Sequence, residues 1–218
     1  VIVPAAGKDP IFPEQPKSLI KIGGKRVLDF QIEALTQAGL KRMLIVRGHE
    51  GDQFDEFYKA NENIGFLDNP NHADKGLLHS LMCTRSEMGE GFLLVYSDIL
   101  MDHEILSRLA HSGKDIVLAV DSSYKYHTHE VEKKLDLVVT KKTFSSGLRS
   151  LRRSPFSEIV RIGKEIPLDE ADSEFIGIAY FSEDGARALQ KMYDDLAQNE
   201  GAKFHESSNF GVASFNDM

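Results

Sequence analysis

Apolar and polar positions in the first half of the chain follow a pattern that is typical of strands and helices taken in turn. Short apolar runs, which predict buried strands, are separated by segments whose apolar residues recur at helical spacing. The predicted strands are residues 1–3, 43–46, 64–67, 92–96 and 116–120. The predicted helices are residues 27–40, 52–60, 77–88 and 104–110. In the second of these, Phe54, Phe57 and Tyr58 are predicted to face the core. This alternation predicts an α/β fold with a mostly parallel sheet and helices on both faces.

The second half of the chain has a different pattern. Its predicted strands, which no long helix separates, are residues 135–140, 158–162 and 175–181. An amphipathic helix is predicted over residues 183–199, and residues 145–155, rich in Ser and Arg, are the most loop-like stretch. Strands that follow one another without crossover helices favour antiparallel pairing, so we expect the sheet to become mixed here.

Composition narrows the classes of function. The 218 residues are 41% hydrophobic and 28% charged, with a net charge of −8. This acidic balance argues against nucleic acid as a partner, because phosphate neutralisation carries that affinity. The single cysteine, Cys83, excludes an internal disulfide and suits a reducing compartment. No apolar run is long enough to span a bilayer, so we expect a cytoplasmic protein without a membrane partner.

The extent of the chain suggests one domain over residues 1–218. It begins at Val1, already inside an apolar run, and we therefore expect it to be a fragment of a longer protein.

The segment after the first strand is the strongest chemical signal. Ala5, Ala6 and Gly7 lead into a loop that ends at Pro16 and Lys17. Small residues let a nucleotide approach the backbone, whose amides bind phosphate oxygens, and a lysine neutralises the same phosphates. The plainer alternative is an ordinary strand-to-loop turn with a solvated lysine. The Gly-Gly pair and the helix start that follow at residues 22–28 make the combination more specific.

The segments VIVPAAG, PKSLIKIGGKRVLDFQIEAL and LLVYSDIL resemble nucleotidyltransferases that make CDP-, UDP- or GDP-linked products. The segments LIVRGHEGDQF, LDNPNHADKGLLHSLMC and EFIGIAYFSEDGA resemble the phosphonate and phosphocholine cytidylyltransferases, above all the cytidylyltransferase domains associated with phosphoenolpyruvate phosphomutase. The resemblance covers nearly the whole chain. It implies a Rossmann-like sheet of the nucleotide-diphospho-sugar transferase type.

The resemblance also implies where the nucleotide binds. Lys17 and Asp98 would act in catalysis, Lys17 on the phosphates and Asp98 as the ligand of Mg²⁺. The remaining residues expected around the nucleotide are Ala5, Ala6, Gly7, Lys8, Asn69, Gly76 and Ser80. An aspartate at a strand end suits a magnesium ion that bridges phosphates. Its alternative role is a helix cap or turn residue.

Two departures from the family pattern stand out. The family continues Ala-Ala-Gly with a second Gly and an Arg, but this chain has neither between Gly7 and Lys17, which leaves Lys8 as a substitute charge. The family also supplies a second acidic metal ligand on a late strand. We assign no equivalent here, because Asp217 lies too near the end of the sequence.

The second half of the chain is expected to bind the acceptor. Lys164 is a catalytic candidate that would meet the acceptor's phosphate or phosphonate. Asp121 and Glu174 are candidates for binding a cationic amine on the acceptor. Each of the three has an equally simple interpretation as a solvated charge at a strand end.

These features predict a Mg²⁺-dependent nucleotidyltransferase. It would transfer CMP from CTP to a small phosphonate, such as 2-aminoethylphosphonate or 2-hydroxyethylphosphonate, and release pyrophosphate. Phosphocholine and a sugar 1-phosphate are alternative acceptors. A non-catalytic, nucleotide-binding regulatory domain of the same fold is the alternative of a different class. A homodimer and a fusion to a mutase domain both stay open.

Overall fold

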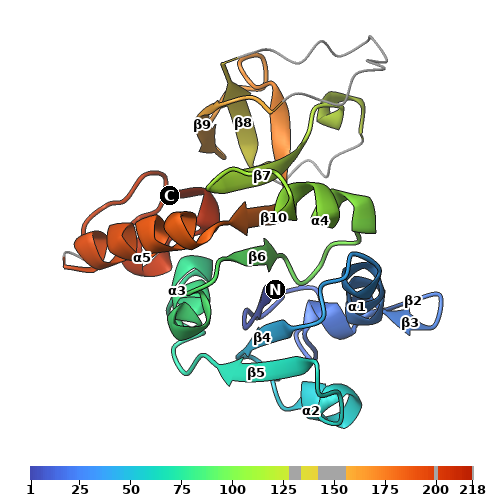
Figure 1. Cartoon of the computed structure of the whole chain (residues 1–218). Helices are drawn as coiled ribbons and strands as arrows, with labels where there is room; N and C mark the ends of the chain where they lie inside the picture. The colour runs from blue at the N-terminus through green and yellow to red at the C-terminus, as the bar shows by residue number, and fades with distance from the viewer. Residues whose placement is uncertain (128–133, 142–155, 199–200, 218) are drawn as a thin grey trace.

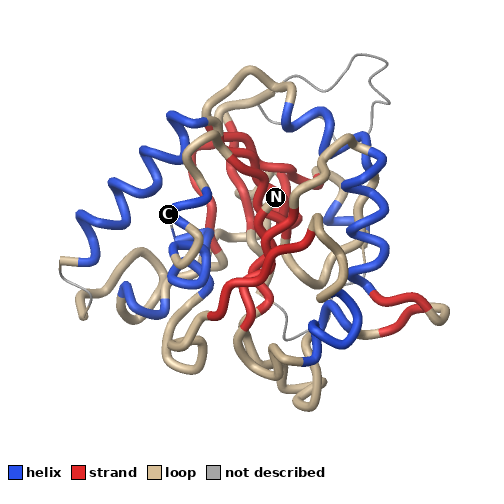
Figure 2. The backbone as a smooth tube through the Cα atoms, turned by 60° about the horizontal axis from the view of Figure 1, so that its bottom comes forward, coloured by secondary structure: helices blue, strands red, loops and turns tan. Residues whose placement is uncertain are grey.

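A computed structural model describes residues 1–127, 134–141, 156–198 and 201–217. The predicted loop at residues 145–155 lies outside the described residues. Within them, an eight-stranded mixed sheet lies between two groups of helices, and a two-stranded hairpin forms a separate sheet (Figure 1). Figure 2 shows the strands of the larger sheet gathered along the middle, with helices on either side. The α/β fold predicted from the sequence is therefore confirmed.

The parallel half of the sheet has the strand order β5-β4-β1-β6. Its strands are β1 (Ile2–Ala5), β4 (Met43–Arg47), β5 (Ile64–Asp68) and β6 (Phe92–Val95). The helices that follow β1, β4 and β5 are α1 (Val27–Gln37), α2 (Gln53–Tyr58) and α3 (Leu77–Met82). Because all four strands run in one direction, their carboxyl ends meet at one edge of the sheet.

The antiparallel half is built around one long, bent strand, β10 (Ser173–Phe181). The end of β10 pairs with β6, and its start pairs with β8 (Leu137–Thr140). A further strand, β7 (Ile116–Asp121), pairs with both the start and the end of β10. On its other side β8 pairs with β9 (Ile159–Gly163). The pairing with β7 shifts register between Phe175 and Ala179, and Gly177 within the shift has a φ of 82°. This irregularity carries β10 from the main sheet into the β8–β9 lobe.

Each face of the sheet has its own hydrophobic core. α1, α2 and α4 (His103–Ala110) cover one face, where buried residues include Leu28, Phe54 and Leu106. α3 and α5 (Glu183–Ala197) cover the other, where Leu81 and Leu189 are buried. A strand that faces two such layers must be apolar on both sides, which explains the continuous apolar runs of β1 and β6.

Two local predictions are wrong. The helix predicted over residues 77–88 ends at Met82, and a 3-10 turn, η2 (Arg85–Glu87), follows. Between them the hydroxyl of Thr84 donates to the carbonyl of Leu81 at 2.7 Å, a local bond that competes with a further helical turn. Phe57, predicted to face the core with Phe54, is 40% exposed, and the Arg26 guanidinium lies 3.5 Å from its ring centroid.

The shorter elements connect this framework to the site. The 3-10 turn η1 (Lys17–Leu19) precedes the hairpin of β2 (Lys21–Ile22) and β3 (Lys25–Arg26), and η3 (Tyr124–Tyr126) follows β7. No helix of the described residues has the length and apolar character that crossing a membrane requires.

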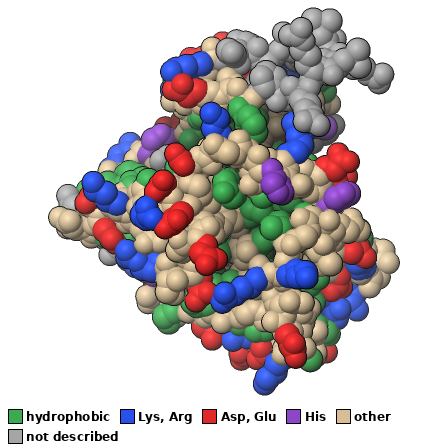
Figure 3. All heavy atoms as spheres, in the orientation of Figure 1, with side chains coloured by type: hydrophobic (Ala, Val, Ile, Leu, Met, Phe, Trp, Pro, Cys, Tyr) green, Lys and Arg blue, Asp and Glu red, His purple; other side chains and the backbone are tan. Residues whose placement is uncertain are grey.

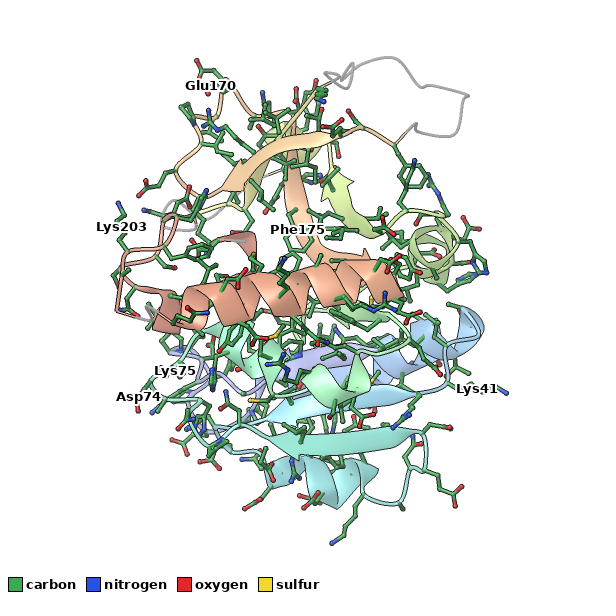
Figure 4. All side chains as sticks on the ribbon, turned by 60° about the vertical axis from the view of Figure 1, so that its left-hand side comes forward. Lys41, Asp74, Lys75, Glu170, Phe175 and Lys203 are labelled. Carbon is green, nitrogen blue, oxygen red and sulfur yellow. The ribbon has the colours of Figure 1, made fainter. Side chains whose placement is uncertain are left out.

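Residues 201–217, which we call the C-terminal segment, pack against the start of α3 and include η4 (Phe210–Val212) and η5 (Phe215–Asp217). The amides of Gly76 and Leu78 donate to carbonyls of Gly211 and Ala213 at 3.0 and 3.2 Å. In Figure 4, Lys203 of this segment lies on the same side of the molecule as Asp74 and Lys75, which follow β5. Lys41, which precedes β4, lies at the opposite end. The C-terminal segment is thus found at the carboxyl ends of the parallel strands.

Candidate active site

Three chain segments approach closely where β1, β4 and β5 end. The amide of His49, just after β4, donates to the carbonyl of Ala6 at 2.9 Å. A Cβ atom on Gly48 would lie 2.5 Å from that carbonyl oxygen and 2.6 Å from Cγ of His72. Only glycine fits at so close an approach. The predicted nucleotide segment at Ala5, Ala6 and Gly7 therefore ends at this edge, where Gly7 is exposed.

The structure brings together Lys17 and Asp98, which are 81 residues apart in the sequence. The Lys17 ammonium lies 3.1 Å from Oδ2 of Asp98 and 2.9 Å from Oδ2 of Asp9. The Lys17 and Asp98 side chains are 42% and 40% exposed, whereas the Asp9 side chain is 8% exposed. The ammonium therefore joins a buried carboxylate to one that solvent and ligands can reach.

The protonation of this cluster follows from its contacts. Burial alone raises the pKa of Asp9, but the hydrogen bonds from Lys17 and two backbone amides, with the lysine's charge, lower it below the usual value. Burial alone lowers the pKa of Lys17, but Asp9 and Asp98 raise it above the usual value. Lys17 is thus an ammonium and Asp9 a carboxylate at neutral pH.

The loop that carries Asp98 is held from beneath by α1. Gln31 is fully buried, and its Nε2 donates to the carbonyls of Tyr96 and Ile99, both at 2.8 Å. These carbonyls lie on either side of Asp98 in the chain. At the end of β6, the amide of Tyr96 also donates to the carbonyl of Gly177, in the irregular part of β10. The position of Asp98 is therefore set by a helix and a strand that are distant in sequence.

The loop between Gly7 and Lys17 is anchored to the start of α2. The Nε2 atom of His49 lies 2.7 Å from the carbonyl of Pro13, and Nε2 of Gln53 donates to the carbonyl of Glu14 at 2.8 Å. Lys8 in the same loop is exposed. The altered loop is therefore an ordered part of the site, with anchors of its own.

Asn69, Gly76 and Ser80, which were expected around the nucleotide, make internal contacts. Asn69 and Ser80 are 1% and 5% exposed, and Nδ2 of Asn69 donates to Oγ of Ser80 at 2.9 Å. Asn69 also accepts from the amide of Asn71 at 2.9 Å. The amide of Gly76 donates to the carbonyl of Gly211. All three residues therefore shape the segment between β5 and α3 in this structure.

Lys164 directly follows β9. Its ammonium is 3.7 Å from Oδ1 of Asp136, and its amide donates to Glu206 of the C-terminal segment at 2.5 Å. Burial raises the pKa of Tyr96, and the charges of Asp136 and Asp98 raise it further, against a hydrogen bond with Ser214. The charges of Asp98 and Asp136 therefore both act on the phenol of Tyr96.

Asp121 and Glu174 are brought together by strand pairing. They are direct partners in the register of β7 and β10, a position in which side chains of adjacent strands are neighbours. Asp121 accepts from the amide and hydroxyl of Ser123 at 2.7 and 2.6 Å and lies 3.1 Å from Nε2 of His127. The structure therefore places two acidic side chains side by side, with His127 next to one of them.

Asp217, left unassigned from the sequence, holds the C-terminal segment together. Its carboxylate is 5% exposed and accepts from the amide of Glu206, the hydroxyl of Ser207 and the amide of Ser214 at 3.1, 2.6 and 2.8 Å. These three bonds satisfy it within its own segment.

Sequence reasoning missed three residues that build the site, Asp9, Gln31 and Gly48. Asp9 lies in the loop between Gly7 and Lys17, where the sequence departs from the family pattern. The helical periodicity of α1 predicts that residue 31 is buried, but it does not predict the hydrogen-bond partners of a buried amide. Gly48 follows a strand, where a glycine was open to interpretation as a close approach.

Solved structures with this architecture include a pyrophosphorylase and a cytidylyltransferase. UDP-glucose pyrophosphorylase from Acinetobacter baumanii superposes with a TM-score of 0.67 at 16% sequence identity, over 87% of this chain and 75% of that one. CTP:phosphocholine cytidylyltransferase from Streptococcus pneumoniae superposes with a TM-score of 0.58 at 15% identity, over 89% of this chain and 77% of that one. The chain has the nucleotide-diphospho-sugar transferase fold.

The model of the MobA-like NTP transferase domain matches residues 1–169. The chain belongs to this family, and it is a nucleotidyltransferase.

Named relatives include cytidylyltransferases at low identity. The CTP:phosphoglutamine cytidylyltransferase of Campylobacter jejuni is 21% identical over 182 residues, 79% of this chain and 67% of that protein. The choline-phosphate cytidylyltransferase of Streptococcus pneumoniae is 24% identical over 103 residues, 47% of this chain and 44% of that protein. The 2-aminoethylphosphonate cytidylyltransferase of Lancefieldella rimae is 24% identical over 199 residues, 88% of this chain and 69% of that protein. The matches thus span from under half to about two thirds of these relatives' lengths.

Proposed function

We propose that the chain transfers CMP from CTP to a small phosphonate and releases pyrophosphate. The observation that carries this proposal is the contact between Lys17 and Asp98 at the carboxyl edge of β1 and β6. The cytidylyltransferase relatives support CTP as the donor, and 2-aminoethylphosphonate is the acceptor in the name of a relative that aligns over 88% of this chain. Phosphocholine and a sugar 1-phosphate are the alternative acceptors.

The proposed chemistry needs no protein nucleophile. An anionic oxygen of the acceptor forms a bond to the α-phosphorus of CTP, while the bond from that phosphorus to the bridging oxygen of the β-phosphate breaks. Both reactants are anions, so the protein's task is to hold them together and to offset their repulsion. Lys17 supplies positive charge to the triphosphate, and the backbone at Ala6 and Gly7 supplies a surface that a phosphate can approach.

Asp98 suits the Mg²⁺ that this chemistry would use. Its carboxylate is a hard oxygen donor and is 40% exposed, so it can exchange its contact with Lys17. Among the described residues, no three His, Cys, Asp or Glu side chains gather as a metal site. Magnesium is commonly held by one or two carboxylates together with substrate phosphates and water. Such an ion would neutralise charge on the triphosphate and on the leaving pyrophosphate.

The acceptor would lie between Tyr96 and the β8–β9 lobe. Lys164 would meet its phosphonate, and the paired carboxylates of Asp121 and Glu174 would favour an amine. The face drawn in Figure 3 carries acidic and basic side chains interspersed, so we assign charge recognition to these local groups.

The test measures pyrophosphate release with Mg²⁺, each of the four nucleoside triphosphates and each acceptor, with ³¹P NMR to identify the product. We expect turnover with CTP and 2-aminoethylphosphonate or 2-hydroxyethylphosphonate. Lys17→Ala and Asp98→Ala should each lower kcat/KM by about 100-fold or more, while Lys21→Ala and Glu90→Ala, at exposed positions, serve as charge-matched controls. Wild-type turnover by Asp98→Ala with Mg²⁺ would contradict the assignment. Nucleotide binding without turnover by the wild type would favour the regulatory alternative.

A further inference from the structure

We propose that Asp9 is a positioning residue, which holds the Lys17 ammonium at the nucleotide site when Asp98 changes its partner. This inference rests on the proposed function and adds to it a residue that the family resemblance does not supply. It also gives a role to the loop that departs from the family pattern.

The two oxygens of Asp9 have separate tasks. Oδ1 accepts from the amides of Ile11 and Phe12 at 2.8 and 2.9 Å, which closes the loop over its own backbone. Oδ2 lies 2.9 Å from the Lys17 ammonium. One carboxylate therefore fixes the course of the loop and the position of the lysine at its far end.

The difference in burial between Asp9 and Asp98 determines which carboxylate stays paired with the Lys17 ammonium. The Asp9 side chain is 8% exposed, whereas that of Asp98 is 40% exposed. Removing the counter-charge from a buried carboxylate is costly, because water cannot replace it. At Asp98, solvent or a ligand can take the place of the ammonium. When Asp98 turns to a new partner, Lys17 therefore stays with Asp9.

The composition of the loop makes this placement important. Between Gly7 and Lys17 there is no arginine, and Lys8 is exposed at the start of the loop. It is the Lys17 ammonium that forms an ion pair with Asp98. A shift of about 1 Å in a group that stabilises a transition state is enough to lower the rate substantially.

The experiment separates the two tasks of Asp9 by substitution. Asp9→Asn keeps an oxygen that can accept from Ile11 and Phe12 but loses the charge that holds Lys17. Asp9→Ala loses both. Glu14→Gln is the matched control, because it removes one negative charge from an exposed position in the same loop. For each variant we would measure kcat and KM for CTP, and hydrogen exchange at the amides of residues 11 and 12.

We expect Asp9→Asn to lower kcat/KM by about 10- to 100-fold while those two amides stay protected. Asp9→Ala should lower kcat/KM at least as much and should also lose the protection. Glu14→Gln should match the wild type in both measurements. Wild-type kcat/KM in Asp9→Asn would overturn the inference.

A double-mutant cycle with Lys17→Met tests whether Asp9 acts through the lysine. In the Lys17→Met background, Asp9→Asn should change kcat/KM, and the Kd of CTP, by less than about twofold. Measuring Kd closes the cycle even where turnover is slow. Full additivity of the two substitutions would refute the positioning role. If the wild type turns over no nucleotide, the proposed function fails; if it is active and Asp9→Asn is too, only this inference fails.

Discussion

Replacing Gln31 by Met is expected to destabilise the protein and to loosen the loop that carries Asp98. Gln31 is fully buried in α1, and its Nε2 donates at 2.8 Å to the carbonyls of Tyr96 and Ile99. Methionine has nearly the same length and volume, so the substitution removes both hydrogen bonds without opening a large cavity. The effect therefore reports on the two bonds.

The magnitude follows from what each bond satisfies. Leaving a buried carbonyl without its donor costs about 1–3 kcal/mol, so two carbonyls give a loss of roughly 2–6 kcal/mol. Oε1 of Gln31 is buried without a hydrogen-bond partner among the described residues, and its removal recovers part of that loss. We expect a net decrease of about 2 kcal/mol in the free energy of unfolding.

Urea unfolding measures the stability, and kcat/KM as a function of Mg²⁺ concentration measures the effect on Asp98. Gln37→Met is the matched control, because it makes the same change at an exposed position of the same helix. An unchanged free energy of unfolding in Gln31→Met, relative to Gln37→Met, would refute the reasoning. A loss of stability with an unchanged Mg²⁺ dependence would show that α1 supports the core and does not position Asp98.

Two further predictions concern the C-terminal segment and the acid limit of stability. At Gly76, φ is −75°, which alanine accepts, but a Cβ would lie 2.3 Å from the carbonyl oxygen of Ala213. We expect Gly76→Ala to lower the free energy of unfolding by about 1–3 kcal/mol in urea, and Gly89→Ala, whose Cβ would meet nothing within 4 Å, to have little effect. Because the pKa of Asp9 is lowered by folding, its charge stabilises the fold above its ordinary pKa, and this contribution disappears as the pH falls through the lowered value. When the pH drops below about 4, the Asp9→Asn variant should therefore lose less stability than the wild type, as measured by thermal unfolding.

Each of these has a clear contrary outcome. Equal stability of the two glycine variants would mean that the C-terminal segment moves away from α3 to accommodate the added methyl group at little cost in free energy. Parallel pH curves for Asp9→Asn and the wild type would mean that folding does not lower the pKa of Asp9.

The elements were predictable because their signals are local. The apolar runs of the strands and the helical spacing of residues 27–40 depend on neighbours in the sequence. The structure confirms these strands and a helix that begins at Val27 and ends at Gln37. The errors arose where another contact prevailed. Thr84 binds the carbonyl of Leu81 where the helix was expected to continue, and Phe57 carries a guanidinium on its ring and is left partly exposed.

The site was predictable only in part. The resemblance singled out Lys17 and Asp98, and the structure places them in contact. Their roles in catalysis, and those of Lys164, Asp121 and Glu174, remain proposals. Asp9 carried no signal of its own, because an aspartate in a loop has many ordinary uses.

The sequence by itself determined the order of strands and helices and the membership in a nucleotidyltransferase family. Both depend on apolar patterns and motifs within short segments, which can be recognised without the tertiary structure. The tertiary structure decided which charges meet. It placed Lys17 between a buried carboxylate and an exposed one, and it put a glutamine of α1 under the loop of Asp98. Such choices depend on burial and on distances between remote segments, and these exist only once the chain has folded.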